Sequence, residues 1–428
     1  MQFVADFHIH SKYSRATSKD MDLENLDKWA KIKGITVLGT GDFTHPEWFK
    51  NLKEKLIPAE LGLYKLKQET RQPDNQTTRF ILTAEISCIY SLKNRVRKIH
   101  IIVFAPSFEA VEKINAHLDR IGNLKSDGRP ILGLNAKELA KIVLNISQDC
   151  LIVPAHLMTP WFSLFGSKSG FDSLEECFEE YSKYIFAGET GLSANPEMLW
   201  RMPDGRRITL ISNSDAHSPA KLGREANIFD TEISYLAIIE AIKSKNPQKF
   251  LYTIEFFPEE GKYHYDGHRN CQIVLSPKES KKYNNLCPVC GRPLTIGVMN
   301  RVEELADRPA FAPLSGASAG KPEGTIPFKS LVPLAEIIAE TLGRGVATKE
   351  VVKHYQNLIG KLGPEFNILL SASREDLKAA TLPEIAEGIV RVRAGKIFIE
   401  PGYDGVFGKV RIFSQGERKT VIKQKTLF

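Results

Sequence analysis

Seven short runs of β-branched and aromatic residues alternate with segments of helical periodicity over the first half of the chain. The runs are Phe3–Phe7, Thr36–Gly39, Phe80–Thr83, Lys98–Phe104, Leu151–Pro154, Tyr184–Ala187 and Ile208–Ile211. Between them, apolar residues recur three and four positions apart, as in Leu23–Lys33, Glu109–Ile121 and Ala136–Ile146. Strands that alternate with helices are typical of a parallel sheet or barrel, so the pattern predicts an α/β fold.

The pattern changes in the second half. After a helical stretch near Asn227–Ser244, residues 260–300 are rich in Lys, Tyr, Asn, Cys and Gly and have little to build a core. The remainder contains a Pro-, Gly- and Ser-rich loop, two amphipathic stretches and a β-like tail: Arg308–Pro327, Leu331–Leu342, Lys349–Leu362 and Ile389–Phe428. We therefore expect a barrel (1–245), a small segment (246–300) and a mixed α+β C-terminal domain (301–428).

Composition narrows the class of protein. The chain has 428 residues, of which 42% are hydrophobic and 25% charged, as in globular rather than disordered proteins. No apolar run approaches the ~18 residues of a membrane span, and MQFVADFHIH does not resemble a secretory signal. Six cysteines are sparse for this length, which favours a reducing compartment, so we expect a cytoplasmic protein. The net charge of +7 permits a nucleic-acid partner without requiring one.

Each predicted strand is followed or interrupted by a side chain that can bind a metal ion. In chain order these are His8 and His10, Asp42 and His45, Glu85, His100, His156, Glu189, and Asp215 with His217. Because strands of α/β folds end at one edge, such side chains can converge. Imidazole and carboxylate ligands suit Zn²⁺, Mn²⁺ and Fe²⁺. Two or three ions at one site can activate water and stabilise displacement at phosphorus, which predicts phosphoester hydrolysis.

Individual members of this set have structural alternatives. His156 could be a hydrogen-bonded core residue, His45 a surface-loop residue before Pro46, and Glu189 a substrate contact or the cap of a turn. The set as a whole is harder to explain without a metal.

A second group has the spacing of a structural zinc site. His268-x₂-Cys271 is followed by Cys287-x₂-Cys290, and Gly291 permits a tight turn after the second pair. Four ligands would complete a tetrahedron, so this zinc would be structural. The alternatives are His264 as the fourth ligand, or free thiols beside a chance histidine. The polar composition of the segment favours the zinc site, because such a segment lacks the apolar residues to fold alone.

Basic and aromatic residues suggest contacts with a phosphate backbone and with bases. The candidate DNA-binding residues are Arg391, Arg393, Lys396, Lys409 and Arg411. On a β tail, Arg391 and Arg393 would share a face, although charged residues also protect edge strands. The loop after His156 contains Trp161, Phe162, Phe165 and Lys168. Its aromatic rings could stack on a base or pack as a lid on the barrel.

The strand-end motifs resemble those of the PHP (polymerase and histidinol phosphatase) metal-dependent phosphoesterases. They are HIHS at 8–11, GTGD at 39–42, AEIS at 84–87, KIHIIVF at 98–104, PAH at 154–156 and SNSDAH at 212–217. The resemblance implies a distorted (β/α)₇ barrel over about residues 1–230.

The resemblance also implies a ligand set. One ion would be held by His8, His10, Glu85 and Asp215, with Glu85 bridging to a second at His100 and His156, and Asp42 and His217 would hold a third. Glu85, Asp215 and His217 are then the catalytic candidates. One departure concerns the third ion, since the family pairs Asp with His at the second motif and here Phe43 follows Asp42.

A narrower resemblance covers nearly the whole chain. It is similar to the endonuclease Q family in ETGLSANP at 189–196, SNSDAHSPAKLGREAN at 212–227, HRNC with CPVCGRPLTIGV, RVEELADRP at 301–309 and PFKSLVPLAEII at 327–338. This resemblance implies a prokaryotic, nucleoid-associated DNA repair endonuclease. Such an enzyme cuts 5′ to a deaminated base (uracil, hypoxanthine, xanthine) or an abasic site, leaving a 3′-OH and a 5′-phosphate. Thr190, Ser193 and Asn195 are candidate pocket residues whose alternative role is to form a turn.

Two other functions fit parts of the pattern. A small-molecule phosphatase of the histidinol-phosphate kind would use the same barrel but leaves the zinc segment and basic tail unexplained. A non-catalytic DNA-binding module with a relic metal site would explain the departure at Phe43. The expected cofactors are one structural Zn²⁺ and two or three Zn²⁺, Mn²⁺ or Mg²⁺ ions in the active site. DNA is the expected partner, and a sliding clamp is a further candidate.

Overall fold

A computed structural model describes residues 1–67, 77–309, 321–414 and 416–417. The C-terminal part of the predicted β-like tail (418–428) and part of the predicted loop Arg308–Pro327 therefore lie outside the described residues. No helix in the described ranges is long and apolar enough to cross a membrane.

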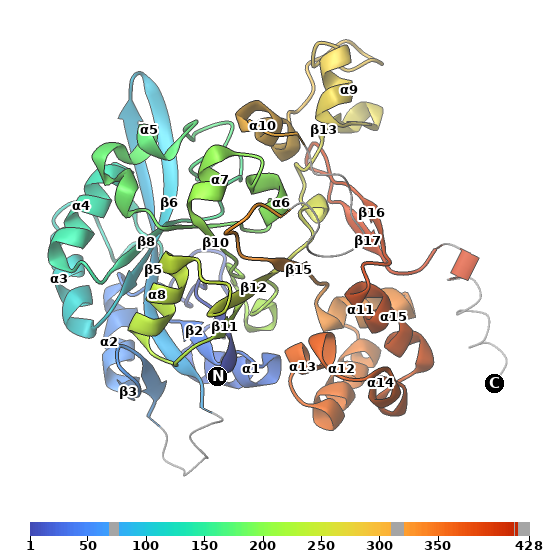
Figure 1. Ribbon diagram of the computed structural model, residues 1–428, viewed down its shortest axis with the longest axis horizontal. Coiled ribbons are helices and arrows are strands. Elements are labelled where there is room, and N and C mark those ends of the chain that lie inside the picture. Colours follow the sequence, from blue (N-terminus) through green and yellow to red (C-terminus); the bar gives the residue numbers. More distant parts are fainter. Residues whose placement is uncertain (68–76, 310–320, 415, 418–428) are drawn as a thin grey trace.

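The first half of the chain forms a distorted barrel (Figure 1). Its strands in the described residues are β1 (Gln2–Asp6), β2 (Val37–Gly39), β5 (Arg79–Leu92), β6 (Arg95–Ala105), β8 (Leu151–Pro154), β9 (Ala187–Glu189) and β10 (Thr209–Ile211). The pairs β1–β2, β2–β5 and β9–β10 are parallel. A bridge between Ile9 and Ala216 brings the segment after β10 back beside the segment after β1. The predicted α/β barrel is confirmed.

One strand departs from the predicted parallel arrangement. β6 forms a long hairpin with β5 and pairs antiparallel with both β5 and β8. The turn at Lys93 and Asn94, both with positive φ, is too short for a helical crossover, and parallel strands need one. Alternation of strand and helix along the sequence therefore did not reveal the direction of this strand.

Further short strands extend the sheet. They are β3 (Leu56–Pro58), β4 (Tyr64–Leu66), β7 (Ile131–Leu132), β11 (Ala226–Asp230), β12 (Phe250–Glu255) and β15 (Phe328–Ser330). β11 pairs with β1, β12 with β11, and β15 with β12. Because β12 lies beyond residue 245, we propose that the barrel unit extends to Glu255.

Helices cover the outside of the barrel (Figure 1). They are α1 (Leu23–Lys33), α2 (Pro46–Lys55), α3 (Phe108–Leu118), α4 (Ala136–Ile146), α5 (Leu174–Phe178), α6 (Pro196–Leu199), α7 (Pro203–Arg207) and α8 (Tyr235–Ser244). Local sequence sets their ends. The Asp22 side chain accepts the backbone N–H of Asn25 at the start of α1, and Gly34 ends that helix with a φ of 87°.

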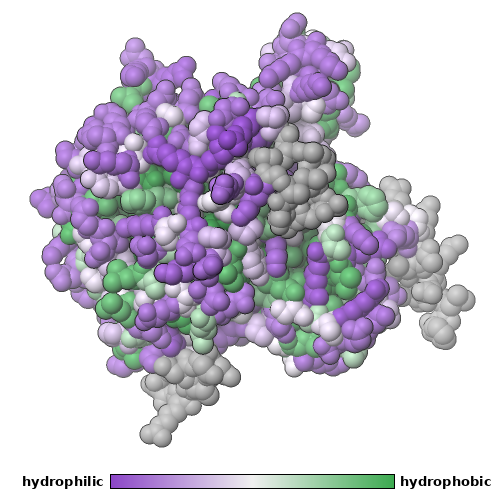
Figure 2. Space-filling model, viewed as in Figure 1, coloured by the Kyte–Doolittle hydropathy of each residue, from purple (hydrophilic) through white to green (hydrophobic). Residues whose placement is uncertain are grey.

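The segment that follows the barrel is small. It contains the hairpin β13 (Asp266–His268) and β14 (Ile273–Leu275), followed by α9 (Pro277–Lys282) and α10 (Val298–Leu305). The buried Asp266 carboxylate joins its parts, because it accepts hydrogen bonds from the Gly297 backbone and the Asn300 side chain, both at 2.7 Å. Figure 2 shows that the surface of this segment, at the upper right, is largely hydrophilic.

The C-terminal part is mainly helical. It consists of α11 (Leu334–Leu342), α12 (Lys349–Leu362), α13 (Glu365–Leu370), α14 (Arg374–Ala380), α15 (Pro383–Arg393) and the two-stranded sheet β16 (Phe398–Glu400) and β17 (Lys409–Arg411). The two predicted amphipathic helices are present. The prediction of a β tail from residue 389 was wrong for its first residues, which belong to α15, whereas β16 and β17 do lie within the predicted range. Ile385, Ile389 and Val392 recur at helical spacing and are buried in the core.

Candidate metal centre

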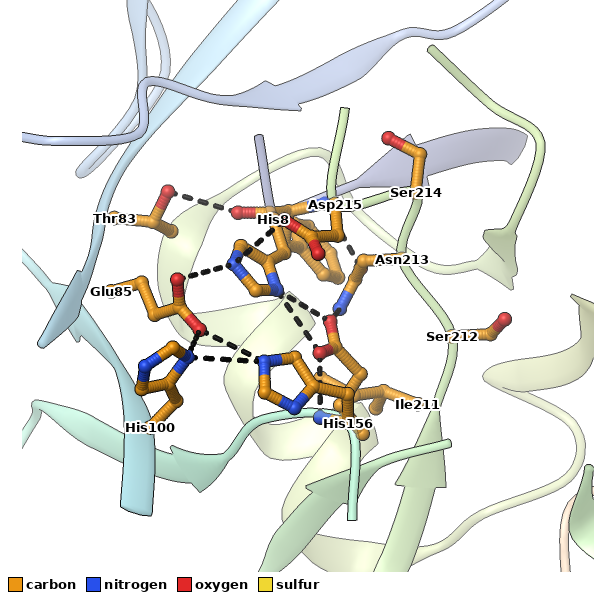
Figure 3. Close-up of polar contacts among 12 residues, drawn as sticks. His8, Thr83, Glu85, His100, His156, Ile211, Ser212, Asn213, Ser214 and Asp215 are labelled. Carbon is orange, nitrogen blue, oxygen red and sulfur yellow. Dashed lines mark hydrogen bonds and ion pairs between the residues drawn. The ribbon is translucent and has the colours of Figure 1, made fainter. Parts of the chain in front are cut away.

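Seven metal-binding side chains from distant parts of the chain converge inside the barrel, and Figure 3 labels five of them. They are His8, His10, Glu85, His100, His156, Asp215 and His217. His8, His156 and Asp215 follow the ends of β1, β8 and β10, as expected from the sequence. Glu85 and His100 instead lie within the long strands β5 and β6. The antiparallel hairpin directs them inward because alternate residues of a strand share a face.

The two carboxylate oxygens of Glu85 face two different pairs of histidines. Oε2 lies 3.2 Å from His10 Nε2 and 3.5 Å from His8 Nε2. Oε1 lies 2.7 Å from His100 Nδ1 and 3.1 Å from His156 Nε2. Glu85 therefore belongs to two groups, in each of which the ligand atoms lie within 4.8 Å of one another. A carboxylate shared in this way is suited to bridge two divalent ions.

Three buried polar atoms in this cluster fit a bound cation. His8 Nε2, His10 Nε2 and Asp215 Oδ1 have no hydrogen-bond partner in the described part of the chain. The Asp215 oxygen lies 3.2 Å from His10 Nε2 and 3.7 Å from His8 Nε2. Each unsatisfied buried group costs about 1–3 kcal/mol, and a metal ion bound to all three would remove that cost. The residues present can therefore hold divalent metal ions.

The electrostatics of the cluster also favour cations. Burial alone would lower the pKa of His8 and His10, but the surrounding carboxylates, chiefly Glu189 for His8 and Asp42 for His10, raise both values well above normal. Burial lowers the pKa of His100 to about 4, so its ring is neutral near pH 7 and can offer a lone pair. The site thus attracts positive charge and already holds one histidine in the ligand form.

Two further carboxylates orient these histidines. Asp42 Oδ1 lies 3.0 Å from His10 Nδ1, and the carboxylate is held by the Ser11 backbone and hydroxyl groups. Both oxygens of Glu189 lie 3.0 Å from His8 Nδ1, and Oε2 accepts the backbone N–H of His156 at 2.9 Å. Carboxylates that accept the second N–H of a ligand histidine fix its tautomer and ring orientation. The geometry gives Asp42 and Glu189 this supporting role.

The third metal site implied by the family resemblance is incomplete. Asp42 belongs to none of the metal-binding groups among the described residues, and His217 forms a group with His10 and Asp215, of which only His10 also belongs to the group of His8 and Glu85. Phe43 is fully buried in the apolar core. His45 lies at the start of α2, and its ring stacks on that of Tyr13 at a centroid distance of 4.4 Å. Because the group at His217 shares His10 with the group at His8 and Glu85, we expect two ions in the barrel.

Backbone strain marks the same site. Asp42, His156 and Asp215 have φ values of 50°, 31° and 46°, in a region that residues other than glycine rarely adopt. Such conformations cost roughly 1–3 kcal/mol each and persist where surrounding structure enforces them. Here they bring three acidic or imidazole side chains to the cluster.

A cavity of about 430 Å³ opens over the metal-binding cluster. It is lined by His100, His156 and Asp215 and also by Arg15, Arg129 and Trp161. The Trp161 side chain is 45% exposed, so it is available to a ligand. Arg15 and Arg129 could not be recognised from the sequence, because no motif surrounds them and only the fold brings their loops to the cavity.

The other residues that the sequence predicted to line the pocket lie in different parts of the structure. Ser193 lines the cavity. Thr190 is fully buried and donates a hydrogen bond to Glu255 at 2.9 Å, and the Asn195 side chain caps α6. Phe165 is buried in the core, whereas Lys168 is exposed and does not line this cavity. The loop is therefore partly a packed lid, as the alternative interpretation supposed, and of its predicted contact residues Trp161 and Phe162 line the cavity.

The cysteine segment brings its four predicted ligands together. His268, Cys271, Cys287 and Cys290 place their ligand atoms within 4.8 Å of one another. Gly291 has a φ of 72°, and its N–H donates to the Cys287 carbonyl at 2.8 Å, which closes the predicted tight turn. His264, the alternative fourth ligand, does not belong to this group. The arrangement fits a closed tetrahedral site.

Two of the five candidate DNA-binding residues are paired with carboxylates. Arg391 pairs with Glu387 and Glu417, and Arg411 pairs with Glu400 at 2.8 Å. Arg393 donates hydrogen bonds to carbonyls at the end of α13, including Leu369 O at 2.8 Å. Lys396 and Lys409 have no carboxylate within 4 Å in the described residues. The expectation that Arg391 and Arg393 share a strand face was wrong, since both lie on α15 and bind protein groups.

Comparisons with known proteins agree with this architecture. A family model described as the MJ0043 C-terminal domain matches residues 333–396, which include α11 to α15. Uncharacterized protein MJ0043 of Methanocaldococcus jannaschii is 36% identical over 263 residues. That match covers 59% of this chain and 31% of the relative, so the chain spans about a third of that protein's length.

Two solved structures match over essentially the full length. The lesion-specific endonuclease PfuEndoQ from Pyrococcus furiosus is 31% identical, with complete coverage of both chains and a TM-score of 0.83. Endonuclease Q in complex with a 27-mer duplex that carries an abasic lesion at the active site is 32% identical. This second match covers 97% of this chain and 98% of the other, with a TM-score of 0.81. The chain therefore belongs to the endonuclease Q family.

Proposed function

We propose that this chain is a metal-dependent DNA repair endonuclease. It hydrolyses the phosphodiester on the 5′ side of a deaminated base, such as uracil, hypoxanthine or xanthine, or of an abasic site. The observation that carries the proposal is the position of Glu85, whose two oxygens serve two metal-binding groups on the floor of an open cavity. The duplex with an abasic lesion bound by a relative supports DNA as the substrate.

The residues of the cluster have distinct tasks in this reaction. His8, His10, Glu85 and Asp215 would hold one ion, and Glu85, His100 and His156 the other. Divalent ions held by these residues would supply an activated water and neutralise charge on the phosphate. Hydrolysis forms a bond between the water oxygen and phosphorus and breaks the bond to the 3′ oxygen. The products are a protonated 3′-OH and a 5′-phosphate. We propose that His217, which is partly exposed beside Asp215, exchanges protons with the leaving oxygen.

Positively charged side chains on both sides of the Trp161 loop support a path for the bound DNA across this face. The β5–β6 hairpin projects at the upper left of Figure 1 and carries Lys93, Arg95 and Lys98. On the other side, α9 carries Lys278, Lys281 and Lys282, all exposed. None of these six side chains lies within 4 Å of a carboxylate in the described ranges. Exposed cations of this kind bind a phosphate backbone.

The loop between these two surfaces is fixed from both sides. Arg97 donates to the Gly170 carbonyl and stacks on the Phe171 ring at 4.0 Å. Arg301 of α10 donates to the carbonyls of Phe165 and Phe171 at 3.0 and 3.1 Å. We propose that this fixed loop presents Trp161 to the space left by a nucleotide that is turned out of the duplex. The tetrahedral Cys and His group, filled by Zn²⁺, would keep α9 and α10 in place.

A cleavage assay tests the proposed function. A 5′-labelled duplex with one deoxyinosine, deoxyuridine or abasic site is incubated with the protein and divalent metal, and the product is sized on a sequencing gel. We expect a cut on the 5′ side of the lesion, absent from undamaged duplex and abolished by Asp215→Ala. The exposed Asp119→Ala is the matched control and should cut like the parent protein. Turnover of a generic phosphomonoester without any DNA cleavage would instead establish a small-molecule phosphatase.

A further inference from the structure

Arg129 holds a guanidinium group against the shared carboxylate of the metal-binding cluster. Its NH1 atom lies 3.0 Å from Glu85 Oε2, the oxygen that also faces His8 and His10. The Arg129 side chain is 26% exposed and lines the cavity over the cluster. Among the described residues its guanidinium donates to no other side chain. A permanent cation therefore stands at the floor of the cavity with most of its hydrogen-bonding capacity unused.

Arg129 lies near the carboxylates of Glu85, Asp215 and Asp127. If divalent ions are held by Glu85 and Asp215, those two carboxylates are shared with the ions, and further negative charge in the cavity would then stabilise the guanidinium. A phosphodiester supplies that charge in the same cavity. The planar fork of a guanidinium matches two phosphate oxygens better than any other side chain does.

We propose that Arg129 binds the non-bridging oxygens of the phosphate that is cut, that Arg15 binds a neighbouring phosphate, and that Asp127 positions both arginines. This inference rests on the proposed function, because it assigns the partner of these arginines within that substrate.

Asp127 connects the two arginines directly. Its buried carboxylate accepts the backbone N–H of Arg129 at 3.1 Å and that of Arg15 at 3.3 Å through Oδ1. Its Oδ2 lies 3.3 Å from the Nε of Arg15, whose side chain is 77% exposed at the cavity wall. One carboxylate thus fixes where two separate loops present their guanidinium groups.

Close packing at Gly128 fixes the loop to the metal-binding cluster. A Cβ atom at this position would lie 2.3 Å from Asp42 Oδ2 and 2.3 Å from Ser14 Oγ, which leaves no room for any other residue. The Gly128 N–H donates to the Tyr13 carbonyl at 3.1 Å, and the Thr44 hydroxyl donates to the Gly128 carbonyl at 3.2 Å. The loop 127–129 is therefore rigidly seated on the same segment that carries His10, as a binding site for a reacting group requires.

The inference is tested with Arg129→Ala and Arg129→Lys, and with the exposed Arg120→Ala as the matched control. For Arg129→Ala we expect kcat to fall about 100- to 1000-fold, as for loss of one donor to a reacting oxyanion, with an unchanged metal content. Arg129→Lys should restore only part of the lost kcat, because lysine lacks the planar fork of the guanidinium. Millimolar guanidinium in solution should partly rescue the kcat of Arg129→Ala. Arg15→Ala should mainly raise KM, by about tenfold, with kcat little changed.

Inhibition by inorganic phosphate gives a readout that does not depend on DNA. Phosphate should inhibit or bind the metal-loaded parent protein and Arg120→Ala equally, and Arg129→Ala at least tenfold more weakly. Asp127→Asn, which keeps the acceptor atom but loses the charge, should show an intermediate loss that lies mostly in KM.

Two outcomes would overturn the inference. In the first, Arg129→Ala keeps parental kcat and phosphate affinity; in the second, it loses bound metal, which would mean that Arg129 only stabilises the empty cluster. If the parent protein binds phosphate through Arg129 but cuts no DNA, the proposed function fails while the phosphate assignment stands.

Discussion

The Nδ1 atom of His10 lies 3.0 Å from Oδ1 of Asp42, a carboxylate that is fully buried. This contact fixes the proton of His10 on Nδ1 and leaves Nε2, 3.2 Å from both Glu85 and Asp215, as the atom that faces the cluster. We therefore expect Asp42 to act through His10, which would explain why a residue of the family's ligand motif lies outside the metal-binding groups.

Replacement of Asp42 by Asn should weaken metal binding without unfolding the protein. The amide can keep the hydrogen bonds from Ser11 but no longer stabilises the required form of His10, and loss of such a supporting group typically costs 10- to 100-fold in metal affinity. Competition with a metal-sensitive dye measures the change. Asp119→Asn, an exposed substitution, serves as control. An affinity equal to that of the parent protein would show that Asp42 does not orient the ligand.

Metal content should be about three ions per chain, two in the barrel cluster and one at the Cys and His group. Cys287→Ser should remove one ion and loosen the segment that carries α9, because that segment has few buried apolar residues. Plasma emission analysis together with limited proteolysis checks both effects. Retention of every ion in this variant, or loss of the barrel ions with it, would contradict two independent sites.

A pair of buried glutamates should make stability fall as pH rises. Burial raises the pKa of Glu255 to about 8, and burial together with Glu255 raises that of Glu225 well above its ordinary value. The folded state therefore holds more protons than the unfolded state from the unfolded pKa of 4.5 upward, so the free energy of unfolding decreases as pH rises toward 8 and beyond.

Glu225→Gln should reduce this decrease. Glu225 Oε2 has no partner among the described residues, so an amide nitrogen in its place can be accommodated and carries no charge to desolvate. Melting temperatures of both proteins at pH 5, 7 and 9 provide the measurement. If the melting temperatures of parent and variant change in parallel with pH, the pair of glutamates does not titrate in this range.

Arg393 should stabilise the C-terminal helices and contribute nothing to DNA binding. Its guanidinium satisfies carbonyls at the end of α13, so Arg393→Ala should lower the free energy of unfolding by about 2 kcal/mol. Chemical denaturation and DNA titration of the same variant separate the two roles. A loss of DNA affinity with unchanged stability would restore the interpretation of this residue as a phosphate contact.

The β5–β6 hairpin should contribute phosphate contacts instead. The double substitution Lys93→Ala and Arg95→Ala at its exposed tip should weaken binding to lesion-bearing and undamaged duplex alike. If both residues contact phosphates, the slope of log K against log salt should fall by about 1.8. Titrations at several salt concentrations measure the slope, with Lys361→Ala on exposed α12 as the control. An unchanged slope would exclude the hairpin from the DNA path.

Much of the metal centre could be predicted from the sequence because its ligands follow short strands. His8, His156 and Asp215 come directly after β-rich runs, and strand ends in this class of fold meet at one edge. The zinc ligands are likewise local pairs whose spacing alone sets their geometry. The prediction of a strand at Ile389–Arg393 was wrong for a local reason as well. This segment contains residue types that strands favour, but its apolar residues also recur at helical spacing, and their burial favoured the helix.

The sequence by itself determined which residue types could bind metal, which pairs could form a zinc site, and that strands alternate with helices. Only the tertiary structure decided that β6 turns back antiparallel, that Asp42 supports His10 and that Phe43 fills the core. It also decided that Arg129 reaches Glu85 from a loop more than forty positions away. The physical reason is that periodicity and spacing encode contacts within a turn or a strand. Contacts between distant segments depend on tertiary packing, because the position of a loop is set by the surfaces against which it packs.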